Sequence, residues 1–87
     1  MQLTFNKKRP APAATLAGLA RGEHGILEAF DLPEDLARRL MELGLLPGVE
    51  VRAARGAPGG DPRVYHVDGA SIALRRETAD RVRLRRP

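Results

Sequence analysis

Apolar and polar residues alternate along several short segments of the chain, which is the pattern of a half-buried β-strand. The alternation is clearest at 49–53 and at 81–85, where Val82 and Leu84 are expected to point inward. Aliphatic, aromatic and β-branched residues also fill three further segments of strand length, at 23–30, 63–67 and 70–75. The pattern therefore predicts five short strands.

One segment, 31–48, has helical spacing and contains its own start signals. Asp31 and Glu34 have the spacing of a capping box, in which the first side chain caps the first helical turn. Pro33 suits that first turn, where its missing N–H is not needed. The segment also has apolar residues at the i, i+4, i+7 spacing of a stripe that faces the core: Leu36, Leu40 and Leu43.

The residues assigned to structure are turn formers. Gly44 is expected to take the left-handed conformation that ends the helix, and Pro47 with Gly48 to form the turn that follows. Asp68-Gly69 predicts a two-residue type I′ hairpin turn between two strands. The loop 56–62 ends in two further residues with a structural assignment, Asp61 and Pro62.

Five short strands cannot bury both faces of an open sheet, whereas curling into a barrel removes the exposed edges. We therefore predict a mainly β fold, a small SH3-like β-barrel of about five strands with one main α-helix inserted after the first strand. Residues 15–87 are expected to form this domain. Residues 1–14, which contain Lys7-Lys8-Arg9 and a Pro/Ala-rich stretch, are expected to be a flexible basic tail.

Composition narrows the class of protein. The 87 residues suit one domain, and the absence of cysteine excludes a disulfide framework and a thiolate metal site. No apolar run is long enough to cross a membrane, and the N-terminus lacks the apolar core of a secretory signal. We therefore expect a cytoplasmic protein that is not embedded in the membrane.

The formal net charge is +4, and much of the excess is arginine between positions 75 and 86. A basic surface of this kind suits an acidic protein, an anionic membrane face or nucleic acid. Alternating arginines also solvate the outer face of an edge strand and discourage edge-to-edge association. The sequence leaves these explanations open.

No catalytic or metal-binding constellation is evident. His24 has Glu28 four residues on, and His66 has Asp68 two residues on, but two such residues do not make a metal site. Ser71 has no base identified by the sequence. The glycines at 56–60 do not precede a helix with the Lys and Ser/Thr of a phosphate-binding loop. We predict a protein that is not an enzyme, with no catalytic residues, no metal ligands and no cofactor.

Three motifs resemble the FeoA family, ferrous iron transport protein A. They are Arg39–Val51, Ala57–Pro62 and Gly69–Arg75, in the family's order and spacing, and the resemblance extends from about Leu16 to Leu84. It implies an SH3-like barrel that also occurs as a C-terminal domain of iron-dependent repressors. It further implies a small cytoplasmic accessory or regulatory protein of bacterial ferrous iron uptake, at the inner face of the membrane. The implied partner is a FeoB-type membrane iron permease with a cytoplasmic GTPase region.

A docking site on that partner is predicted at the helix end and the following turn. Met41 points away from the apolar stripe, while Leu45 and Leu46 follow the helix stop. Met41 and Leu45 are expected to supply an apolar anchor, with Leu46 as a further candidate. The alternative is that Leu45 or Leu46 closes one end of the core. Arg38 and Arg39 are expected to supply charge at the rim. Leu40 is expected in the core, and an open barrel end would also let it contact the partner. The alternatives are a nucleic-acid-binding barrel, which scarce aromatic residues make unexpected, and a self-associating module that forms a weak homo-oligomer.

Overall fold

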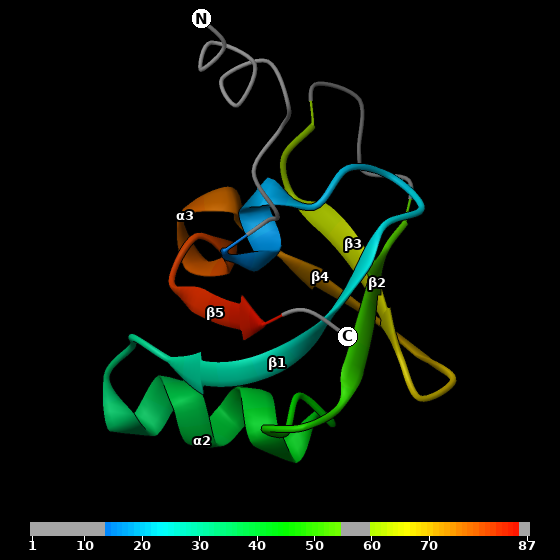
Figure 1. The fold of residues 1–87 in the computed structure, drawn as a ribbon. Helices are drawn as coiled ribbons and strands as arrows, with labels where there is room; N and C mark the ends of the chain where they lie inside the picture. The colour runs from blue at the N-terminus through cyan, green and yellow to red at the C-terminus, as the bar shows by residue number, and fades with distance from the viewer. Residues whose placement is uncertain (1–13, 55–59, 86–87) are drawn as a thin grey trace, which may run out of the picture.

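The computed structural model describes residues 14–54 and 60–85 (Figure 1). In chain order its elements are η1 (Leu16–Gly18), β1 (His24–Phe30), α2 (Glu34–Glu42), β2 (Glu50–Ala53), β3 (Arg63–Val67), β4 (Ala70–Leu74), α3 (Arg76–Ala79) and β5 (Val82–Arg85). All five predicted strands are present, and each lies within two residues of its predicted bounds. The tail predicted for residues 1–14 lies outside the described residues, apart from Ala14.

The strands form one antiparallel sheet in the order β4-β3-β2-β1-β5. The prediction of a mainly β fold with one main helix after the first strand is confirmed. The sheet is not closed, because β4 and β5 lie at its two edges and do not pair with each other in the described part of the chain. Figure 1 shows α2 lying along β1 at one end of the sheet.

The N-terminal 3-10 turn η1 packs beside α3 and β5 and is held there by hydrogen bonds from β3. The buried Tyr65 hydroxyl donates to the Leu16 carbonyl over 3.0 Å, and Arg63 Nη1 donates to the Ala17 carbonyl over 3.2 Å. Leu16 and Leu19 are buried in the core. The Ala14 carbonyl accepts a hydrogen bond from Leu84 N–H at 2.8 Å, so the ordered contacts begin one residue before the predicted domain boundary.

The core combines residues from every layer of the fold. Val82 and Leu84 point inward as predicted, and Leu40 of α2 belongs to the same cluster. None of the buried side chains in the described ranges is polar or charged apart from the Tyr65 hydroxyl, whose hydrogen bond is satisfied. This matches the rule that buried polar groups find partners.

The hairpin between β3 and β4 has the predicted turn. Asp68 has φ +48° and Gly69 has φ +84°, and a type I′ turn requires positive φ at both central residues. The register places Val67 opposite Ala70, directly across this two-residue loop. The twist of the turn therefore matches that of the two strands.

The start of α2 differs from the prediction. Pro33, with φ −56° and ψ 148°, occupies the N-cap position, and no side chain caps the helix. Asp31 lies two residues too early to act as the cap, and its N–H instead donates to the Arg81 carbonyl over 2.7 Å. Glu34 and Asp35 lie in the first turn, where negative charge interacts favourably with the helix dipole.

Tyr65→Phe should lower the free energy of unfolding by about 1 kcal/mol, because it removes one buried hydrogen bond to η1. Burial raises the pKa of the Tyr65 phenol above its ordinary value, and the nearby positive charges of Arg63 and Arg76 lower it by a smaller amount. The unfolded chain therefore loses the phenolic proton first, and stability should fall as the pH rises above about 10. Urea unfolding between pH 8 and pH 11 measures this, and Tyr65→Phe should show a smaller decline than the parent chain.

Candidate partner-binding site

The C-terminal end of α2 forms a Schellman motif. Gly44, with φ +110°, is the left-handed residue, as the sequence predicts. The Leu45 N–H donates to the Leu40 carbonyl over 3.1 Å, and the Gly44 N–H donates to the Met41 carbonyl over 3.0 Å. These are the two hydrogen bonds that define the motif, which reverses the chain direction after Leu43.

The motif explains why Leu45 is part of the core. A Schellman motif frequently brings together the side chains of the two residues that share its longer hydrogen bond, here Leu40 and Leu45. Leu40 is 4% exposed and Leu45 is 0% exposed, in the same core cluster. The prediction that Leu45 is a surface anchor is therefore wrong, and the sharing of Leu40 with a partner finds no support in its burial.

The buried face of α2 is rotated relative to the predicted stripe. Ala37 and Leu40 are buried, whereas Leu36 and Met41 are half-buried. With about 100° per residue, Leu36 and Met41 lie at similar angles on either side of the buried pair. Leu43 lies further round and just beyond the last helical residue, so it is 53% exposed instead of buried as predicted.

A second turn follows immediately and exposes Leu46. The Val49 N–H donates to the Leu46 carbonyl over 3.1 Å, with Pro47 and Gly48 as the central residues. Gly48 has φ +94°, so these two residues have the conformation of a type II turn. Leu46 is 46% exposed at the first position of this turn.

Leu43 and Leu46 are the exposed large hydrophobic residues of the described chain. They flank the Schellman glycine, three residues apart. We call this region the α2-turn surface, formed by Leu43 and Leu46 with Arg39 at its rim; Met41 lies on the opposite side of α2. Three of the six predicted partner-binding residues are exposed, Met41 is half-buried and two are buried; the exposed ones are Arg38, Arg39 and Leu46, and the buried ones are Leu40 and Leu45. Leu43, which is exposed, was not among the six.

The two rim arginines are exposed but differ in their surroundings. Arg38 Nη2 lies 3.5 Å from Glu34 Oε2 in an i, i+4 pair that is open to solvent. Such a pair contributes little to stability. Arg39 lies in the last turn of α2, next to the exposed leucines, and its positive charge suits the negative end of the helix dipole.

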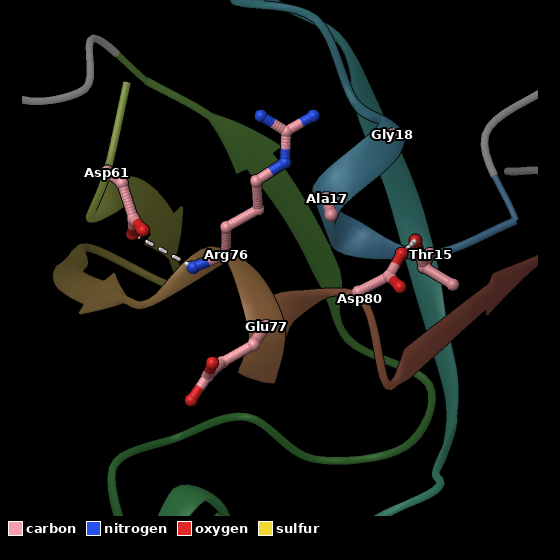
Figure 2. A pocket seen from close by; sticks show the side chains of 7 residues that line it. All are labelled: Thr15, Ala17, Gly18, Asp61, Arg76, Glu77 and Asp80. Carbon is pink, nitrogen blue, oxygen red and sulfur yellow. Dashed lines mark hydrogen bonds between the residues drawn. The ribbon is translucent and has the colours of Figure 1, made fainter. Parts of the chain in front are cut away.

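A groove lies on another side of the molecule, where η1, α3 and the start of β3 meet (Figure 2). The Arg76 backbone N–H donates to Asp61 Oδ1 over 3.0 Å, so Asp61 caps α3 from outside the helix. Thr15 Oγ1 donates to Asp80 Oδ1 over 3.4 Å. Both carboxylates therefore hold η1 and α3 in place, which agrees with the structural assignment of Asp61. The Asp61-Pro62 peptide bond is cis.

The remaining polar pairs lie on exposed strand positions. Ser71 Oγ and His66 Nδ1 are 3.0 Å apart across β3 and β4, a pair that sequence spacing did not reveal because the hairpin register creates it. His24 Nε2 lies 3.4 Å from Glu50 Oε2. Residues 14–54 and 60–85 contain no group of three or more His, Cys, Asp or Glu side chains arranged to hold a metal ion.

None of the described helices has the length and apolar character needed to cross a membrane.

Solved structures of known proteins show the same arrangement of strands and helix. FeoA from Stenotrophomonas maltophilia, determined with zinc and described as an SH3 domain protein, is 38% identical, with a TM-score of 0.72. That match covers 84% of this chain and 91% of the other. Iron(II) transport protein A from Clostridium thermocellum is 28% identical, with a TM-score of 0.74, over 80% of this chain. The matched region is 43% of that longer protein, less than half its length.

A manganese-dependent transcriptional repressor shares the fold, with a TM-score of 0.74 at 18% identity, over 90% of this chain and 39% of the repressor. The SH3-like fold predicted from the sequence is thus confirmed. No curated protein sequence matches the chain. The family model of the FeoA domain matches residues 14–86, which is nearly all of the predicted domain. The chain belongs to the FeoA domain family.

Proposed function

We propose that this chain is an accessory protein of bacterial ferrous iron uptake, which docks through the α2-turn surface on the cytoplasmic GTPase region of a FeoB-type iron permease. Family membership supports the accessory role in iron uptake. The Stenotrophomonas maltophilia relative is described as a candidate activating factor of bacterial ferrous iron transport. The single observation that carries the docking site is the pair of exposed leucines that flanks Gly44.

The α2-turn surface has the composition of a small protein interface. Two exposed leucines provide apolar contact area, and Arg39 lies one helical turn before Leu43. Binding energy in interfaces concentrates in a few central residues that are shielded from water by a polar rim. Because Gly44 and Gly48 fix the two turns, the backbone that carries both leucines has a defined path before a partner binds, which lowers the entropy cost of docking.

The aromatic residues argue against a nucleic-acid-binding barrel. Single-strand binding usually depends on aromatic rings that stack on bases. Tyr65 is fully buried with its hydroxyl engaged, and Phe30 packs against the core. Phe5, the third aromatic residue, lies outside the described residues.

The proposed role is tested by ferrous iron uptake in cells that lack this chain. We expect uptake to fall and to be restored by the parent chain. The matched variants are Arg39→Glu, at the rim of the α2-turn surface, and Arg83→Glu, an exposed arginine on β5. Arg39→Glu should restore uptake poorly, while Arg83→Glu should restore it fully. Normal uptake without the chain would contradict the accessory role, and equal rescue by both variants would contradict this docking site.

A further inference from the structure

The two edges of the sheet are protected to different degrees. At the β5 edge, the Leu84 N–H donates to Ala14, Thr15 forms a bridge with Arg83, and Arg83 and Arg85 are exposed. Charged residues and covering segments are the usual means by which proteins prevent edge strands from pairing. The β4 edge, Ala70–Leu74, contains no charged residue and no proline.

The register shows which backbone groups of β4 are free. The Ala54 N–H donates to the Val64 carbonyl over 2.8 Å, so the backbone groups of Val64 point toward β2. Backbone groups alternate in direction along an antiparallel strand, so those of Tyr65 point toward β4, where its partner is Ile72. The N–H and C=O groups of Ser71 and Ala73, on either side of Ile72, therefore point away from the sheet. No described backbone group outside the sheet pairs with them.

We propose that the β4 edge pairs with the β4 edge of a second copy of this chain, in an antiparallel dimer centred on Ile72. In that register Ser71 of one copy lies opposite Ala73 of the other, so each outward group meets a complementary group. Two such pairs give four backbone hydrogen bonds around the two-fold axis. The edge is thus complementary to itself, which favours a second copy over an unrelated strand.

The side chains of this edge also permit close approach. The exposed residues of this edge are small: Ala70, Ser71 and Ala73. A second strand can therefore approach β4 to the usual 4.7–4.9 Å between neighbouring strands. Ile72 faces the core side of the sheet. In the dimer it lies directly opposite Ile72 of the second copy, in a non-hydrogen-bonded pair, where side chains lie close together. The α2-turn surface is formed by other residues and takes no part in this contact.

Sedimentation equilibrium of the full chain, from about 10 μM to about 1 mM, tests the dimer, because a small interface is expected to dissociate in this range. The mean mass should rise from one chain toward two. Ala73→Pro removes an outward N–H that β3 does not use, and Ala73→Lys adds a charge at the edge; each should weaken association at least tenfold. Ala20→Lys, an exposed position outside the sheet, should leave it unchanged.

Amide hydrogen exchange at the two concentration limits identifies the interface. The Ser71 and Ala73 amides should exchange more slowly at high concentration, whereas the Ile72 amide, which is bonded to β3, should not change. A chain that remains a monomer throughout would overturn the proposal. So would a dimer that Ala73→Pro leaves intact, or one that is lost when Leu43 and Leu46 are replaced by alanine.

Discussion

Leu45→Ala is expected to lower the free energy of unfolding by about 2–5 kcal/mol, the range for buried leucines truncated in a core. Leu45 is fully buried, and its backbone N–H closes the Schellman motif on Leu40. The variant would leave a cavity beneath the end of α2. For a domain of this size that loss is a large fraction of the total stability, so the variant should be partly unfolded at 37 °C.

Leu43→Ala is the matched control, because the same atoms are removed two residues earlier. Its side chain is half exposed, so the change in stability should remain within about 0.5 kcal/mol. Urea titration followed by circular dichroism measures both variants. Equal destabilisation by the two substitutions would contradict the inward and outward assignment of Leu45 and Leu43.

The double variant Leu43→Ala/Leu46→Ala is expected to weaken binding to the permease's GTPase region at least about thirtyfold, or about 2 kcal/mol. Both side chains are exposed in the free chain and would be desolvated in the complex. Their removal should raise the dissociation rate much more than it lowers the association rate. Surface plasmon resonance with the immobilised GTPase region separates the two rates.

Two controls accompany the double variant: a measurement of its own stability, and a substitution at another exposed position of the molecule. Its circular dichroism spectrum and unfolding midpoint should match those of the parent chain, since neither leucine belongs to the core. Arg83→Ala, on β5, should leave the affinity unchanged. An affinity of the double variant equal to that of the parent would place the docking site elsewhere on the molecule.

Local signals predicted the strands and turns correctly because each depends on a few neighbouring residues. Asp68-Gly69 favours positive φ at both positions whatever surrounds it. The alternation at 81–85 is enough to predict that Val82 and Leu84 face the core. Gly44 likewise takes the left-handed conformation that ends α2, as its position in the sequence predicts.

The prediction of Leu45 as a surface anchor is wrong because it assumes that the stripe of Leu36, Leu40 and Leu43 fills the small core without it. Leu43 fits an i, i+7 stripe only if the helix continues, but α2 ends at Glu42. The chain reversal at Gly44 then brings Leu45 into the core. An apolar residue directly after the glycine is itself a signal of a Schellman motif, so the sequence contains the information that the periodicity obscured.

Other features depend on contacts that no local pattern reveals. Asp61 caps α3 across fifteen residues of sequence, and Tyr65 holds η1 across forty-nine. The pairing of Ser71 with His66 depends on the hairpin register. Such contacts depend on how the strands are connected and paired. The length of the chain and the alternation of its residues predict the class of fold but not these individual contacts.

Docking on the permease is the central claim, and a calorimetric titration of its GTPase region with this chain tests it most directly. The titration is performed with GDP, with a non-hydrolysable GTP analogue and without nucleotide. We expect saturable binding with one chain per GTPase region in at least one of these states, and a dependence on nucleotide would indicate regulation of the permease. Absence of binding in all three states, and to the intact permease in detergent, would contradict the claim.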